Sequence, residues 1–190
     1  MISTLSKEDL KFEYNRQHDA HEILLVLLEE LMGVNAVAKE AIQTDVQLTS
    51  IATSAANLLP TNSVSHSILF VPVASTIQNA FAKFLEDKPL LGDNLYHCLQ
   101  CSKYMPAYRQ TRITHAPLAL VVQLKMFTFL DGETFYDSSN VNIFPNLLTP
   151  KAVSDDIIIK HSYRLLTIFN LQGSLDSGHY WTLVANSRCS

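Results

Sequence analysis

A histidine near the end of the chain lies between a glycine and a run of strand-forming residues, in the segment SGHYWTLVANS (residues 177–187). An imidazole in such a place can act as a general base toward a nucleophile, with a third group orienting the ring. A lone histidine beside aromatic residues is more often a packing residue, so the rest of the chain must decide the role of His179. No G-x-S-x-G segment is present, which excludes a serine hydrolase of the common type.

Two cysteines separated by two residues, Cys98 and Cys101 in YHCLQCSK, have the spacing of half a zinc ribbon. A structural zinc site needs four ligands. Ala52 and Ala55 stand before a strand, where a second cysteine pair is expected, and alanine supplies no ligand. We therefore favour an unmetallated turn with two free thiols, and expect no metal and no cofactor.

Other readings of the cysteines and histidines are weaker. His66 and His97 are possible zinc donors, although nothing in the sequence brings them together. A thioredoxin-type redox pair lacks the surrounding βαβ pattern. Cys189 follows His179 by ten residues and lies at the chain end, where a preorganised nucleophile is not expected.

The elements that must position these residues begin with a helix over residues 19–32. Its apolar residues recur at three- and four-residue spacing. Asp19 and Glu22 resemble a capping box, and Gly33 is a plausible stop. A second helix is predicted over 75–87, with Ser75 and Gln78 as its capping box and Pro89 beyond its end. The apolar residues of the first helix are Ile23, Leu24, Leu27, Leu28, Leu31 and Met32.

Strands are predicted mainly in the second half of the chain, where Val, Ile, Leu, Phe and Tyr are frequent. Early helices and late strands favour an α+β fold with a mostly antiparallel sheet. Between the two helices, the segment 34–65 is expected to hold two irregular strands and a mobile connection. The other predicted strands are residues 65–74, 118–129, 163–170 and 179–185.

Length and charge set the broad class of protein. The 190 residues, 47% of them hydrophobic, favour one domain. A net charge of −4 gives no reason to expect nucleic acid or an anionic membrane as a partner. No segment reaches the roughly 18 consecutive apolar residues of a membrane span. The start lacks an apolar signal core, and three cysteines are too few for a disulfide framework, so a cytoplasmic or nuclear location is expected.

Five segments together resemble the ubiquitin-specific protease family, papain-like cysteine proteases that remove ubiquitin. The match runs from about Arg16 to Asn186. It implies a papain-like fold in a single partial domain, 1–190, with a thumb helix at about 14–33, a finger region at 34–110 containing the helix 75–87, and an antiparallel palm sheet at 111–190. The five segments are QHDAHEILLVLLEEL, the stretch from GDNLYHCLQCSK to LKMF, VNIFPNLL, YRLLTIFNLQG and SGHYWTLVANS.

The resemblance implies roles for five residues of this sequence. His179 would be the general base, Gly178 would permit the tight turn before it, and Tyr180 would wall the channel for the ubiquitin tail. Gln17 and Asp19 stand in the Gln-x-Asp-Ala motif, where the acid holds that tail; Asp19 is also a plain helix cap, and the two roles are compatible. The implied partners are ubiquitin and ubiquitinated proteins.

The departures from the family pattern bear on activity. The family places its nucleophilic cysteine well before the Gln-x-Asp-Ala helix and its orienting acid or amide after the Gly-His-Tyr strand, and the 190 residues hold neither. Ile23, Met126 and Leu171 also differ from the usual residues. We expect this chain alone to be inactive, as a fragment, an incomplete gene model or a pseudoenzyme. The alternatives are an inactive ubiquitin-binding or scaffold module and, less favoured, a small zinc-binding module around Cys98 and Cys101.

Overall fold

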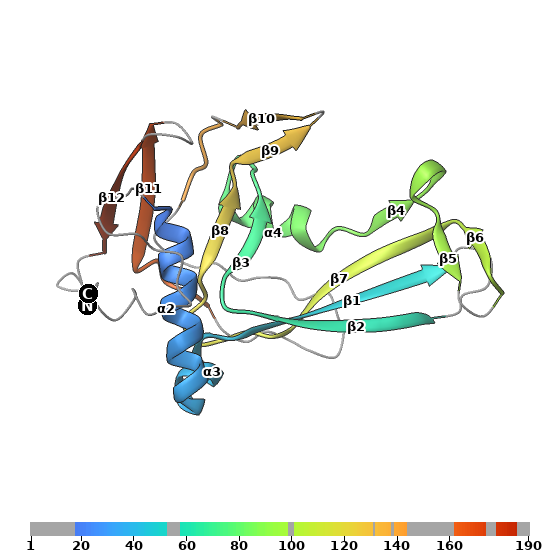
Figure 1. The fold of residues 1–190 in the computed structure, drawn as a ribbon, viewed down its shortest axis with the longest axis horizontal. Helices are drawn as coiled ribbons and strands as arrows, with labels where there is room; N and C mark the ends of the chain where they lie inside the picture. The colour runs from blue at the N-terminus through green and yellow to red at the C-terminus, as the bar shows by residue number, and fades with distance from the viewer. Residues whose placement is uncertain are drawn as a thin grey trace.

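A computed structural model describes residues 18–52, 58–98, 101–130, 132–137, 139–143, 162–173 and 178–185. The molecule is elongated: a body of helices and short sheets carries a long arm of antiparallel strands (Figure 1). No helix in these ranges is long and apolar enough to cross a membrane.

Helix α2 (Ala20–Val34) confirms the first predicted helix. Asp19 is its N-cap, and the carboxylate Oδ1 accepts a hydrogen bond from the backbone N–H of His21 at 2.9 Å. This cap satisfies one of the free N–H groups at the start of the helix. The helix runs one residue past Gly33, the predicted stop.

A further helix, α3 (Ala36–Ile42), follows directly, where irregular strands were predicted. Its N-cap is Asn35, whose side-chain oxygen accepts hydrogen bonds from the N–H groups of Val37 and Ala38 at 3.0 and 3.1 Å. The segment AVAKEA contains mostly strong helix formers, so an asparagine cap is enough to start a second helix there. The prediction for residues 34–65 missed this helix, and that part of it was wrong.

The arm is a four-stranded antiparallel sheet in the order β2-β1-β7-β4. The two irregular strands predicted for this region are present as β1 and β2, whose pairing has a register shift between Thr49 and Ile51. The mobile connection predicted between them lies outside the described residues. Strand β7 crosses residue 110, where the sequence places the division between finger and palm; that division stays a prediction. The four strands are β1 (Thr44–Ala52), β2 (Leu58–His66), β4 (Lys88–Leu90) and β7 (Ala107–His115).

The core lies where the arm enters the body. Strand β3 (Leu69–Pro72) pairs in parallel with β8 (Val122–Lys125), and helix α4 (Ile77–Leu85) contacts both β3 and β7. Arm and body thus share one apolar cluster, which fixes the arm to the body. Its buried members are Val46, Leu69, Val71, Ala74, Ala80, Phe81, Leu85 and Ile113.

Helix α4 confirms the second predicted helix but begins at a different cap. Thr76, and not Ser75, is the N-cap: its hydroxyl accepts the N–H of Asn79 at 3.1 Å. Ser75 instead accepts a hydrogen bond from the Asn79 side-chain amide at 2.9 Å. The helix ends before Pro89, as predicted.

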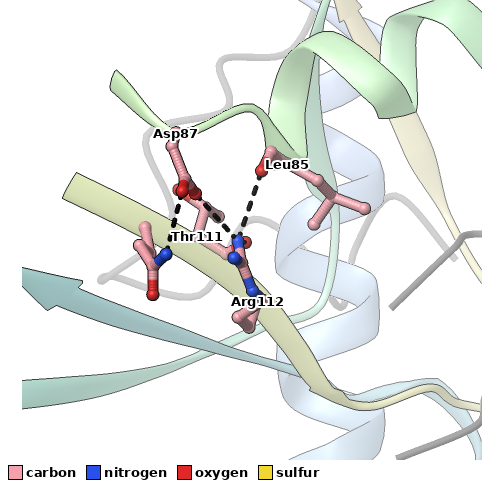
Figure 2. Close-up of polar contacts among 5 residues, drawn as sticks. Leu85, Asp87, Thr111 and Arg112 are labelled. Atoms are coloured by element: carbon pink, nitrogen blue, oxygen red, sulfur yellow. Dashed lines mark hydrogen bonds and ion pairs between the residues drawn. The ribbon is translucent and has the colours of Figure 1, made fainter. Parts of the chain in front are cut away.

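A polar clamp joins the end of α4 to strand β7 (Figure 2). One guanidinium nitrogen of Arg112 donates to the backbone carbonyl of Leu85 at 3.4 Å and to that of Thr111 at 2.9 Å, and lies 3.2 Å from the Asp87 carboxylate. The side-chain amide of Gln110 donates to the other Asp87 oxygen at 2.8 Å. These bonds satisfy a carbonyl at the helix end and tie the helix to the arm.

Three antiparallel hairpins complete the described structure. The β5–β6 hairpin lies at the distal end of the arm, far from β11–β12 in the body (Figure 1). The strand predicted over 118–129 is divided into two, since β8 ends at Lys125 and β9 begins at Phe127. The strands predicted over 163–170 and 179–185 are present with shifted ends. The hairpins are β5 (Tyr96–Cys98) with β6 (Lys103–Met105), after a 3-10 turn η1 (Gly92–Asn94); β9 (Phe127–Leu130) with β10 (Glu133–Tyr136); and β11 (Thr167–Gly173) with β12 (Gly178–Val184).

Candidate functional site

The β11–β12 hairpin presents the Gly-His-Tyr segment at the start of β12. Gly178 is opposite Gly173, His179 is opposite Gln172 and Tyr180 is opposite Leu171. Because successive side chains of a strand point to opposite faces, His179 and Tyr180 lie on different sides of the hairpin. His179 is exposed and Tyr180 is half-buried.

Tyr180 contacts Asp19, a residue of the predicted site from the other end of the chain. Its hydroxyl donates a hydrogen bond of 2.8 Å to Oδ1 of Asp19, across 161 positions of sequence. Asp19 caps α2, so this bond holds strand β12 against the start of that helix. The structure therefore brings together Asp19 and Tyr180, two of the residues that the sequence singles out.

The surroundings of Tyr180 favour the protonated form of its phenol. Burial raises the pKa of Tyr180, and the hydrogen bond to the negative Asp19 raises it further. Glu22 adds a smaller effect in the same direction, against a lowering by the N–H of Ala20. A protonated hydroxyl is a donor, and the raised pKa extends the pH range over which Tyr180 can donate to the carboxylate.

The other residues of the predicted site are less constrained. Within the described ranges no hydrogen bond reaches the imidazole of His179, so nothing there orients the ring. Gln17 lies outside the described residues. The roles assigned to these residues, and to Gly178, stay predictions.

The Cys-x-x-Cys segment is at the other end of the molecule, on the β5–β6 hairpin (Figure 1). Cys98 is buried and Cys101 is exposed. Among the described residues no group of three or more His, Cys, Asp and Glu side chains could hold a metal ion.

Ala52 and the two histidines that the sequence singles out lie on three different strands of the structure. Ala52 ends β1, is buried, and pairs with Ala107 of β7. Ala55 lies outside the described residues. His66 ends β2, whereas His97 is on β5, where its ring contacts that of Tyr104 with centroids 4.9 Å apart.

His21 is a residue near the site that the sequence analysis missed. Its ring meets Phe70 of β3 edge-on, with centroids 5.2 Å apart and planes at 79°. The Nε2 atom is buried and has no hydrogen-bond partner among the residues described. This contact packs the first turn of α2 against strand β3. Nothing in the sequence pattern distinguishes position 21 from an exposed position of the helix.

A second missed group surrounds Asp45, where α3 meets the arm. Oδ1 of Asp45 accepts hydrogen bonds from Gln43 at 2.8 Å and from the Ser65 hydroxyl at 2.6 Å. Burial acts to raise the pKa of Asp45, but these bonds and the nearby His115 and Lys39 outweigh it, so the pKa lies below its usual value. The group stabilises the junction of β1 and β2.

The chain matches a known protein family over nearly its whole length. A family profile described as ubiquitin carboxyl-terminal hydrolase matches residues 1–189. Ubiquitin carboxyl-terminal hydrolase 25 of Arabidopsis thaliana is 28% identical over 93% of this chain, and the chain spans 29% of that relative. Ubiquitin carboxyl-terminal hydrolase 42 of Homo sapiens is 23% identical over 98% of this chain, which spans 15% of it.

Solved structures share the fold. The SAGA DUB module of Ubp8, Sgf11, Sus1 and Sgf73 bound to monoubiquitin has a chain that superposes with a TM-score of 0.75 at 21% identity. The match covers 90% of this chain and 41% of that one. The same module bound to ubiquitin aldehyde gives a TM-score of 0.75 at 20% identity, with 42% of its chain covered.

Proposed function

The chain belongs to the ubiquitin carboxyl-terminal hydrolase family, and we propose that it supplies the ubiquitin-tail site and the general base of a cysteine-type deubiquitinase. Its α+β fold is the papain-like fold of ubiquitin-specific proteases, which confirms the fold class predicted from the sequence. The proposed reaction is hydrolysis of the isopeptide bond after the C-terminal glycine of ubiquitin. Ubiquitin and ubiquitinated proteins are the proposed partners.

One observation supports this proposal above the others: the hydrogen bond between Tyr180 and Asp19. Each residue belongs to a different motif of the family resemblance, and the motifs lie at opposite ends of the sequence. A packing role for the Gly-His-Tyr segment would not require contact with the capping carboxylate of α2. The contact puts an exposed negative carboxylate beside the hairpin that presents His179.

In the proposed reaction, His179 takes the proton of the nucleophilic thiol. The thiolate attacks the isopeptide carbonyl, the C–N bond breaks, and the imidazolium returns the proton to the leaving lysine amine. Water then attacks the thioester carbon, with His179 taking a proton from the water, and releases the thiol and the ubiquitin carboxylate. Asp19 would hold the tail by accepting N–H groups or pairing with an arginine.

The nucleophile of this reaction would come from outside the 190 residues. Cys98 and Cys101 are on the distal hairpin of the arm, remote from β12 (Figure 1). Neither is placed to react with His179, and Cys189 lies outside the described residues. In the family pattern the cysteine precedes the helix that Asp19 caps.

A chimera tests the proposal. Flanking segments of a family relative would be joined to residues 1–190 to supply the cysteine and the orienting acid, and cleavage of a fluorogenic ubiquitin conjugate would be measured. Changing His179→Ala should lower turnover by about 10²–10⁴-fold, the usual contribution of a general base, with ubiquitin binding nearly unchanged. Gln172→Ala, opposite His179 on β11, is the matched control and should retain activity. More than half of the activity remaining in His179→Ala would refute the assignment.

The second candidate function is a ubiquitin-binding module without catalysis. It is favoured by the distance of both described thiols from β12 (Figure 1). The 190-residue chain should then bind ubiquitin but not react with a ubiquitin probe that has a thiol-reactive tail. Labelling at Cys189 would contradict this and show that the terminal cysteine had been misjudged.

A further inference from the structure

The two oxygens of the Asp19 carboxylate have different surroundings. Oδ1 accepts both hydrogen bonds, from the N–H of His21 at 2.9 Å and from the hydroxyl of Tyr180 at 2.8 Å. Over the described part of the chain no donor reaches Oδ2. Asp19 is an exposed residue, so its carboxylate lies at the surface.

The role of Asp19 as a helix cap does not by itself explain why one carboxylate oxygen accepts both hydrogen bonds. One N–H donor leaves the carboxylate free to turn, because its two oxygens are chemically equivalent. The second donor comes from Tyr180, whose backbone is fixed by pairing with Leu171 of β11. Two donors on one oxygen, from a helix and from a strand, fix the plane of the carboxylate and leave the other oxygen as the acceptor.

We propose that Tyr180 is a positioning residue, whose hydroxyl holds Oδ1 of Asp19 so that Oδ2 is presented to the N–H donors of the ubiquitin tail. This inference rests on the proposed function. It assigns to the hydroxyl of Tyr180 a part in tail recognition that is distinct from lining the channel. A carboxylate fixed before binding loses less conformational freedom when the tail binds, which increases affinity.

Binding of ubiquitin to the 190-residue chain tests the inference, with intact ubiquitin and with ubiquitin that lacks its C-terminal tail. Tyr180→Phe removes only the hydroxyl and should weaken binding of intact ubiquitin by about 3–10-fold, the equivalent of one net hydrogen bond. Binding of tail-less ubiquitin should not change. After Asp19→Asn, which keeps a capping side chain, adding Tyr180→Phe should change affinity by less than about twofold.

Tyr163→Phe is the matched control, because the hydroxyl of Tyr163 is also half-buried and donates at 2.6 Å, but to the carbonyl of Pro117. It should leave binding of both ubiquitin forms unchanged. Asp19→Glu is a second variant, for use if Tyr180→Phe fails to fold. It keeps the charge but moves the carboxylate away from Tyr180, and should weaken binding of intact ubiquitin only.

The outcomes separate the inference from the function on which it rests. If the unmodified chain binds both ubiquitin forms equally, or neither, the proposed function fails and the inference fails with it. If Asp19→Asn weakens binding of intact ubiquitin but Tyr180→Phe and Asp19→Glu do not, Asp19 binds the tail without help from Tyr180, and only the inference is overturned.

Discussion

At the scale of single residues, the bond between Tyr180 and Asp19 makes a prediction that needs no ligand. Burial and the neighbouring carboxylate both raise the pKa of Tyr180. Asp19→Asn removes the negative charge, so the pKa of Tyr180 should fall toward its usual value. Titration of the tyrosine ring carbons by NMR in the two proteins measures the change.

Tyr163 provides the reference for that titration. Its pKa is also raised, by burial alone, and it donates to a backbone carbonyl instead of a carboxylate. The pKa of Tyr163 should be the same before and after Asp19→Asn. An unchanged pKa of Tyr180 in the variant would contradict the bond to Asp19.

Asp45 gives a prediction about acid stability. Because its pKa is lowered in the folded protein, the ionised carboxylate stabilises the fold at pH values above its unfolded pKa of about 4, and this contribution is lost as pH falls through the lower folded-state value. Asp45→Asn should cost about 1 kcal/mol of unfolding free energy at pH 7, with the difference vanishing in strong acid. Urea unfolding across this pH range measures it.

Asp93→Asn is the control for Asp45, since Asp93 is exposed and has no hydrogen bond to any described residue. It should leave the stability unchanged at both pH values. A loss in Asp45→Asn that persists at low pH would show that packing, and not the charge, is responsible.

At this scale the sequence predicted some parts of the site and not others. The cap at Asp19 follows from residue type and from the helix after it. The contact with Tyr180 could not be derived from spacing, because 161 positions separate the two residues and only the tertiary fold joins them. His21 and Asp45 gave no signal, since burial of a polar side chain depends on neighbours from distant strands.

At the scale of elements, the Arg112 clamp should stabilise the joint between α4 and β7 (Figure 2). The side chain of Arg112 is only 16% exposed and donates to two backbone carbonyls. The side chain of its ion-pair partner, Asp87, is 43% exposed. Arg112→Met should therefore cost about 2 kcal/mol, because carbonyls lose their donor, and Asp87→Asn less than about 1 kcal/mol. Chemical unfolding of the two variants and of the double variant measures the coupling.

Arg109→Met is the matched control for the clamp. Arg109 is on the same strand and is exposed, and its side chain has no hydrogen bond or ion pair to a described residue. It should change stability by less than about 0.5 kcal/mol. An equal loss in Arg109→Met and Arg112→Met would show that the charge of the arm matters more than the clamp.

The sequence predicted helices correctly where apolar residues recur at helical spacing or a capping residue begins the segment. Both predicted helices are present, and Thr76 replaced Ser75 as the cap because either hydroxyl can begin that helix. Helix α3 was missed although Asn35 and the alanine-rich segment after it are helix signals, because the wider segment resembles a loop in composition. Parallel pairing of β3 with β8 depends on contacts between distant segments and could not be predicted.

At the scale of the whole molecule, the arm should fold without zinc. A four-ligand site needs donors where this chain has Ala52 and Ala55, so elemental analysis of the purified chain should find no stoichiometric zinc. One tightly held zinc per chain would contradict the prediction. Changing both Ala52 and Ala55 to cysteine should create a site, detectable as one bound zinc and a higher melting temperature, if the geometry of the arm allows it.

The contact between Asp19 and Tyr180 also has a consequence for synthesis on the ribosome. Asp19 leaves the ribosome 161 residues before its partner. At roughly 5–20 residues per second, about 8–32 s pass before Tyr180, the partner of the helix cap, has been made. During that interval the start of the helix lacks the hydrogen bond that joins it to strand β12 in the folded protein. The site can assemble only after nearly all of these residues have been made.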